Sequence, residues 1–260
     1  MISSLATEGI RGVLLDIEGT TTPISFVHDV LFSYARSQVR NFLTEHFGSA
    51  ELLADLEQLR EEHAADVKHG LQPPALVDVN VGVDGPCDAE IDSVSEYVSW
   101  LIDRDRKSTG LKSLQGKIWK QGYSDGTLKA ELFAEVAPAL ERWRQAGLKI
   151  SIFSSGSSLA QKLLFAHTEA GDLTGFIDNY FDTTVGSKTD VASYRRIASA
   201  LSLPARSVLF ISDVVPELDA AGAAGMQTLL CVRPGNHPQP FAERYQAIRD
   251  FDEIQVHIPD

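Results

Sequence analysis

The chain has 260 residues, of which 43% are hydrophobic and 23% charged, and its formal net charge is -13. This composition excludes a disordered chain, and the length allows one large domain or a domain with a second one inserted into it. An acidic chain repels nucleic acid and anionic membrane surfaces, so we expect neither as a partner.

The first predicted element is a buried strand over Gly12–Asp16, because the run "GVLLD" is almost continuously apolar. It leads into "DIEGTTTPI", where Glu18 follows Asp16 closely. The region 23–125 then shows no convincing buried strand. It contains the amphipathic helical patterns "SFVHDVLFSYARSQVRNFLTEHF", "AELLADLEQLREEHAADVKHG" and "IDSVSEYVSWLIDRD". We therefore predict a mostly helical domain over 23–125, inserted into a core formed by residues 1–22 and 126–260.

Strands and helices alternate in the rest of the chain. The predicted strands are Leu148–Ser154, Asn179–Thr184, Ser207–Asp213 and Gln227–Val232. Helical patterns lie before and between them, with Gly147 expected just past a helix end, Thr189 as a helix N-cap and Pro216 in a first helical turn. This alternation is typical of an α/β fold with a doubly wound, Rossmann-like parallel sheet.

Polar residues follow the strands of this predicted sheet, at the edge where such folds bind ligands. They are Asp16 and Glu18 after the first strand, Ser154 and Ser155 after the second, Lys188 after the third and Asp213 after the fourth. Each has an ordinary structural explanation, since acids and serines cap helices and lysines lie on surfaces. Their shared topological position on consecutive strands favours a functional site.

The residue types suit phosphoryl transfer. Carboxylates are hard ligands for Mg²⁺ and can attack phosphorus, while hydroxyls and helix N-termini bind phosphate oxygens. A lysine neutralises the charge that develops during transfer. Such a site would supply the positive charge that an acidic chain otherwise lacks.

The order of these residues resembles the four signatures of the haloacid dehalogenase-like (HAD) hydrolase superfamily. The helical insert is similar to the cap domain of that superfamily. The longer strings "DIEGTTTPISFVHDVLFSYAR", "WKQGYSDGTLKAELF", "DVVPELDAAGAAGM" and "RPGNHP" resemble the enolase-phosphatase family of methionine salvage. The resemblance covers essentially the whole chain.

This resemblance implies a bifunctional reaction on 2,3-diketo-5-methylthiopentyl-1-phosphate, which is enolised and then dephosphorylated to an acireductone. By the same resemblance, Asp16, Glu18 and Asp213 would hold one Mg²⁺, position 18 by its side chain or its backbone carbonyl. Ser154, Ser155 and Lys188 would bind the substrate phosphate, and Asp16 would be the nucleophile.

Glu18 stands where most phosphatases of the superfamily carry Asp, so it is the candidate general acid and base. The proton-abstracting base of the enolase step is either Glu18 or a residue of the insert. Thr20 occupies the position of the motif threonine and is expected to brace the loop by hydrogen bonding.

The alternatives are another Mg²⁺-dependent phosphatase of the superfamily, acting on a sugar phosphate or phosphoglycolate, and a phospho-ligand binding protein without catalysis. No N-terminal signal pattern is present, and no apolar run approaches the ~18 residues of a membrane span, so we expect a cytoplasmic protein. We also expect a monomer, with Cys87 and Cys231 as reduced thiols.

Overall fold

The computed structural model describes residues 5–7, 9–77, 88–104, 106 and 108–256. The chain divides into two compact units, one formed by Met1–Val27 with Lys129–Asp260 and the other by His28–Leu128. The predicted domain bounds were 22/23 and 125/126, a few residues from these divisions. Cys87 and most of the connection before it lie outside the described residues.

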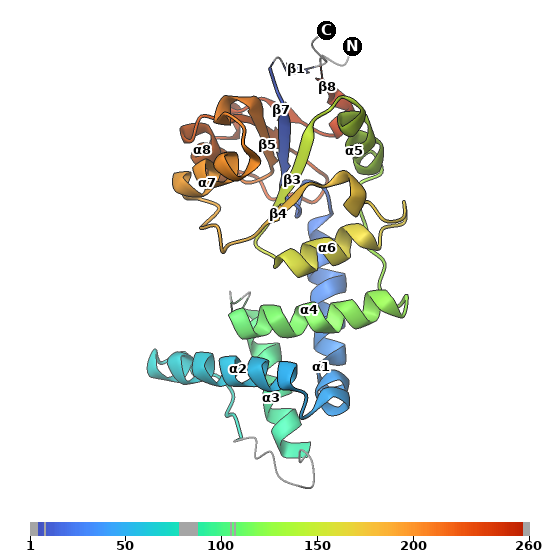
Figure 1. The fold of residues 1–260 in the computed structure, drawn as a ribbon. Coiled ribbons are helices and arrows are strands. Elements are labelled where there is room, and N and C mark those ends of the chain that lie inside the picture. Colours follow the sequence, from blue (N-terminus) through green and yellow to red (C-terminus); the bar gives the residue numbers. More distant parts are fainter. Residues whose placement is uncertain (1–4, 8, 78–87, 105, 107, 257–260) are drawn as a thin grey trace. The chain divides into compact units, whose positions relative to one another are not determined.

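The first unit is built on a six-stranded sheet in the order β4-β3-β2-β5-β6-β7, and every pairing in it is parallel (Figure 1). The strands are β2 Gly12–Leu15, β3 Lys149–Phe153, β4 Asn179–Phe181, β5 Val208–Ser212, β6 Gln227–Cys231 and β7 Ala247–Ile248. A separate short pair joins β1 Leu5–Thr7 to β8 Ile254–Val256. The doubly wound parallel sheet predicted from the sequence is confirmed.

The order of the strands reverses at β2. The chain continues from β2 to β3 and β4 on one side, and then crosses to β5, β6 and β7 on the other. Leu15 of β2 is level with Ile152 of β3 and Ile211 of β5. The residues that follow β2 and β5 therefore leave the sheet side by side, at the kind of switch point where open α/β sheets bind ligands.

Helices cover the sheet on both faces. They are α5 Val136–Gln145, α6 Ser158–Ala166, α7 Val191–Leu201 and α8 Val215–Ala223, with short 3-10 turns at Thr174–Phe176, Ala205–Ser207, Ala242–Arg244 and Phe251–Glu253. α7 and α8 lie on one face and α5 and α6 on the other (Figure 1). Gly147 follows α5 with φ +75°, and Pro216 lies in the first turn of α8, as predicted.

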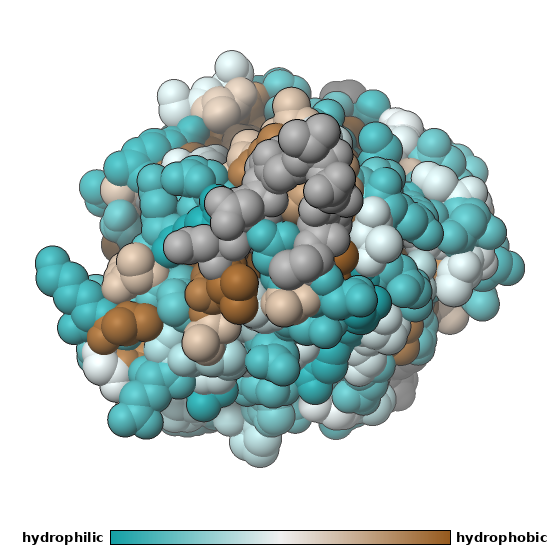
Figure 2. Space-filling model, turned by 90° about the horizontal axis from the view of Figure 1, so that it is seen from below, coloured by the Kyte–Doolittle hydropathy of each residue, from teal (hydrophilic) through white to brown (hydrophobic). Residues whose placement is uncertain are grey.

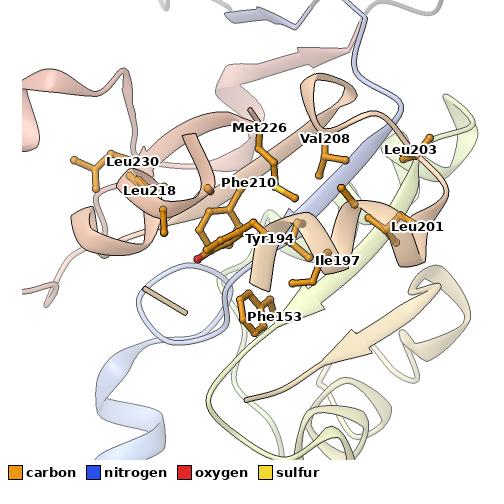
Figure 3. Packing of buried hydrophobic residues seen from close by; sticks show 14 of the residues in the cluster. Phe153, Tyr194, Ile197, Leu201, Leu203, Val208, Phe210, Leu218, Met226 and Leu230 are labelled. Carbon is orange, nitrogen blue, oxygen red and sulfur yellow. The ribbon is translucent and has the colours of Figure 1, made fainter. Parts of the chain in front are cut away.

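The core under α7 and α8 is a cluster of apolar side chains around Tyr194 (Figure 3). Its ring lies 5.1 Å from that of Phe210 on β5 and 5.5 Å from that of Phe153 on β3, centroid to centroid. All of these residues are fully buried. Aromatic pairs at these separations stabilise a core beyond the area that they bury, so the cluster fixes α7 over the middle of the sheet.

Four predicted strands extend one residue too far at one or both ends, and two further predictions are wrong. The strand predicted to reach Thr184 ends at Phe181, because Asp182 accepts hydrogen bonds from the backbone and hydroxyl of Thr184 and turns the chain. The N-cap of α7 is Asp190 and not Thr189: its carboxylate accepts from the amide of Ala192 at 2.9 Å. Aspartate is the stronger capping residue of the two.

The second unit is helical, as expected. It contains α1 Ser33–His46, α2 Ala50–Lys68, α3 Asp88–Asp103 and α4 Thr109–Ser124, preceded by a π-helical segment, Phe26–Phe32. Ser49 and Ser108 cap α2 and α4. α1 packs against α3 and α4, and α2 packs against α4. Figure 2 shows a largely hydrophilic molecular face on which apolar side chains form small groups.

Candidate active site

Asp16 lies directly after β2 and is 4% exposed. Its Oδ1 accepts from the amide of Ile17 at 2.8 Å and lies 2.5 Å from Nζ of Lys188. Its Oδ2 accepts from the hydroxyl of Ser212, at the end of β5, at 3.1 Å. The register of β2 and β5 produces this pairing, so the sheet itself places the first acid of the site.

Lys188 comes from the loop between β4 and α7 and is buried. Its carbonyl accepts from the hydroxyl of Tyr194 at 2.7 Å, which ties the loop to the core. Nζ lies between Asp16 and Glu217, 2.8 Å from Glu217 Oε2. Burial opposes the charge of Lys188, but the two carboxylates outweigh it and raise its pKa to about 12. The ammonium is therefore charged at any working pH.

Asp213 and Glu217 follow β5 and are both buried. Burial and the charge of Asp16 raise the pKa of Asp213 to about 7, and the same two causes raise the pKa of Glu217. Lys188 contacts two acids of this cluster, Asp16 and Glu217, and its charge also acts on the third, Asp213. The site is therefore short of positive charge, and a divalent cation would relieve it.

Glu18 lies on a tight turn after β2 and is half-buried. Its charge contributes to the raised pKa of Asp213, which places the two acids in one electrostatic neighbourhood. The turn needs glycine at position 19, where φ is +66° and a Cβ would come within 2.5 Å of Asp213 Oδ2.

The threonines of this turn are all buried. The amides of Thr20, Thr21 and Thr22 converge on the carbonyl of Ile17. The hydroxyl that braces the loop belongs to Thr21, which donates toward the carbonyls of Asp16 and Ile17, whereas the hydroxyl of Thr20 has no partner among the described residues. The brace predicted at Thr20 is therefore made one residue later.

Ser154 and Ser155 follow β3, the neighbour of β2. Ser154 is buried and its hydroxyl accepts from the amide of Gly156 at 3.2 Å, while Ser155 is half-buried. Ser157 caps α6. In the described part of the chain neither Ser154 nor Ser155 hydrogen-bonds Asp16 or Lys188, although Lys188 Nζ lies 5.8 Å from the ring centroid of Phe153.

The acids fit a magnesium ion that keeps part of its own shell. Within the described ranges no group of three or more His, Cys, Asp or Glu side chains surrounds one metal position. Mg²⁺ takes one or two carboxylates and completes its octahedron with waters and phosphate oxygens. Asp16 and Asp213 supply two buried carboxylates whose mutual repulsion a cation would offset.

Comparison with known proteins relates this arrangement to a family of enzymes. The model of the haloacid dehalogenase-like hydrolases matches residues 10–225. A curated relative from Synechococcus elongatus, named Enolase-phosphatase E1, is 49% identical over 245 residues, 94% of this chain and 98% of that protein. A relative of the same name from Sorangium cellulosum is 44% identical over 94% of this chain and 97% of that protein. Another, from Drosophila pseudoobscura, is 42% identical over 94% of each chain.

The chain belongs to the enolase-phosphatase E1 family. Solved structures are similar to this chain as well. The UTR4 protein of Saccharomyces cerevisiae is 33% identical with a TM-score of 0.73, covering 94% of this chain and 99% of that one. CbbY of Rhodobacter sphaeroides shares the fold. It is 17% identical with a TM-score of 0.55, covering 95% of this chain and 97% of that one. Within the described residues no helix is long and apolar enough to cross a membrane.

Four residues that contact this candidate site lie outside the predicted set, namely Ser212 and Glu217, described above, and Arg233 and Asn236. Arg233 and Asn236 follow β6 and donate to the carbonyls of Thr20 and Gly19, on the turn that carries Glu18. Both belong to the string "RPGNHP", whose family likeness was visible in the sequence but whose contact with the turn was not.

Proposed function

We propose that this chain converts 2,3-diketo-5-methylthiopentyl-1-phosphate, through 2-hydroxy-3-keto-5-methylthiopentenyl-1-phosphate, to 1,2-dihydroxy-3-keto-5-methylthiopentene and phosphate in methionine salvage. The observation that carries the proposal is the family relationship, with identities of 41–49% to several curated relatives over almost the entire chain. The buried cluster of Asp16, Lys188 and Asp213 has the chemistry that the phosphatase step needs.

The phosphatase step that we propose uses the charged groups around Asp16. A carboxylate oxygen of Asp16 attacks phosphorus while the bond from phosphorus to the substrate oxygen breaks, and Glu18 protonates that leaving oxygen. Glu18 then takes a proton from the water that attacks the aspartyl phosphate, which releases inorganic phosphate and restores Asp16. Lys188, whose ammonium contacts Asp16, neutralises the charge on the transferred group.

Ser154 and Ser155 would hold the phosphate oxygens, in the loop that precedes α6. Asp16, Asp213 and residue 18 would hold Mg²⁺. When bound, the ion would neutralise phosphate charge and stabilise the enediolate of the first step. The raised pKa of Asp213 and the single lysine among three acids support a cation there.

The helical region 23–125 would serve as the cap domain that covers the methylthio tail and excludes water, with 1–22 and 126–260 as the catalytic core. The partner is a small phosphorylated substrate, and neither nucleic acid nor membrane is expected with a net charge of -13. We place the enzyme in the cytoplasm as a monomer.

The test is a coupled assay with the diketone phosphate and Mg²⁺. Enol absorbance should rise first and inorganic phosphate should follow. Asp16→Asn should reduce phosphate release to the background rate because the amide cannot form the aspartyl phosphate. The control Asp172→Asn, in an exposed turn, should behave as wild type.

Phosphate release without an enol phase, or faster turnover of a sugar phosphate or phosphoglycolate, would indicate another phosphatase of the superfamily instead. Full phosphate release by Asp16→Asn would remove Asp16 as the nucleophile.

A further inference from the structure

The segment Arg233–Asn236, directly after β6, lies against the turn after β2. Arg233 donates from Nε and Nη2 to the carbonyl of Thr20, at 3.2 and 3.0 Å. Asn236 donates from Nδ2 to the carbonyl of Gly19 at 2.9 Å and to that of Cys231 at 3.2 Å. Two adjacent carbonyls of the turn are therefore held from one neighbouring loop.

Hydrogen bonds, an ion pair and two aromatic rings hold the guanidinium of Arg233 in place. It is 5% exposed, and its Nη2 lies 2.5 Å from Glu135 Oε1. Its Nη1 donates to the carbonyl of Arg249 at 2.6 Å, and its guanidinium lies 4.3 Å from the ring centroid of Phe133 and 5.0 Å from that of Phe251. A buried guanidinium stays charged and needs partners for its donors. Here those partners hold the side chain rigidly against Thr20.

The orientation of the Asn236 amide follows from its neighbours. Two carbonyl oxygens face one end of the side chain, and only the NH₂ group can donate to both. Oδ1 then lies on the Gly19 side, since a Cβ at Gly19 would come within 2.9 Å of it and within 2.5 Å of Asp213 Oδ2. Asn236, Gly19 and Asp213 thus pack on one another, and the position of the turn sets where Glu18 stands relative to Asp213.

We propose that Arg233 and Asn236 are positioning residues, which hold the Glu18–Thr20 turn in the geometry that catalysis requires. This inference rests on the proposed function, because it is the enolase-phosphatase reaction that needs Glu18 near Asp16 and Asp213. Neither residue contacts the substrate in this role. They act through the carbonyls of Gly19 and Thr20.

The test compares Arg233→Lys and Asn236→Ala with matched controls, Arg244→Lys and His237→Ala, whose side chains are exposed. A lysine keeps the charge of Arg233 but cannot reach Thr20 and Arg249 together. Displacement of catalytic groups by ~1 Å costs on the order of 100-fold in rate. We expect both variants to lose kcat by about this factor with KM nearly unchanged, at temperatures well below their unfolding, and both controls to match wild type.

Hydrogen exchange supplies a readout that does not depend on activity. The amides of Thr20–Thr22 donate to Ile17 and should be protected in the wild type. In both variants a peptide covering the turn should exchange faster, while peptides of α7 should not change. Asn236→Ala keeps the test decisive if Arg233→Lys does not fold.

The outcomes separate the two proposals. Wild-type kcat in the variants, or an equally protected turn, would overturn the positioning role. A variant that loses only thermal stability, with kcat intact, would show a merely structural role and would also overturn it. A wild-type enzyme that forms no enol contradicts the proposed function instead, and the exchange measurement still decides whether these two residues hold the turn.

Discussion

At the scale of single residues, the site is dominated by acids that are buried close together. The ammonium of Lys188 pairs with Asp16 and Glu217, and its charge also acts on Asp213. Burial and the charge of Asp16 raise the pKa of Asp213 from 3.8 to about 7. An ionised Asp213 therefore destabilises the metal-free protein, and a bound cation would reverse this effect.

The pH dependence of stability tests this balance. Between pH 3.8 and about pH 7 the folded protein keeps a proton on Asp213 that the unfolded chain has lost, so metal-free stability falls as pH rises through this window. Mg²⁺ must displace that proton at low pH, so it binds more weakly there. Thermal melts should show a larger Mg²⁺-induced rise in Tm at about pH 8 than at about pH 6.

Asp213→Asn isolates the contribution of this carboxyl from that of other titrating groups. The variant should show little Mg²⁺-induced rise at either pH, whereas Asp172→Asn should retain the wild-type pattern, since Asp172 lies in an exposed turn. An equal Mg²⁺ effect at both pH values in the wild type would argue against Asp213 as a group that must ionise to bind the metal.

At the scale of elements, α7 connects the apolar core to the lysine loop. Tyr194 packs its ring between Phe153 and Phe210 (Figure 3). Its hydroxyl donates to the carbonyl of Lys188. Burial is the main cause that raises the pKa of Tyr194, so the hydroxyl stays a neutral donor. The position of Lys188 therefore depends on a contact made from inside the core.

Tyr194→Phe should keep the ring packing but leave the carbonyl of Lys188 without its donor. A buried polar group that loses its partner costs about 1–3 kcal/mol, so the free energy of unfolding in urea should fall by that amount. Tyr245→Phe is the matched control. Its hydroxyl bonds Asp219 at an exposed site, so it should change stability by less than ~0.5 kcal/mol. Equal losses in the free energy of unfolding would show that the hydrogen bond to Lys188 stabilises the protein no more than the exposed bond does.

At the scale of the whole molecule, the net charge of -13 makes copies of the chain repel one another. The face shown in Figure 2 is largely hydrophilic, with apolar side chains in small groups. Large exposed apolar patches are what normally mark an association surface. The net charge and the face shown in Figure 2 both support the single chain that we propose.

Sedimentation equilibrium should accordingly give a mass of 28.4 kDa. The mass should stay at this value when added salt screens the repulsion between copies. A mass of about twice this value at low micromolar concentration would show a dimer and contradict the proposed monomer. The same sample should retain full activity after dilution.

The parallel sheet, its main strands and the acids and lysine at its edge could be predicted from the sequence alone. Each of these depends on local pattern: continuous apolar runs make strands buried on both faces, and parallel strands deliver the residues after them to one edge. Gly147 and Pro216 were equally readable, because their backbone preferences are intrinsic. The short strands β1, β7 and β8 were missed, since two or three residues carry no periodic signal.

Which of these groups contact one another could not be predicted in this way, because it depends on how the strands and loops pack. The ion pairs of Lys188 join Asp16, 172 positions away, to Glu217, and sequence spacing cannot reveal such pairs. The same is true of Arg233 and Thr20, which are 213 positions apart. Burial of these groups sets their charges and pKa values, and burial exists only after the strands have packed. The residue types of the site could therefore be predicted from the sequence, while its geometry and electrostatics arise from the fold.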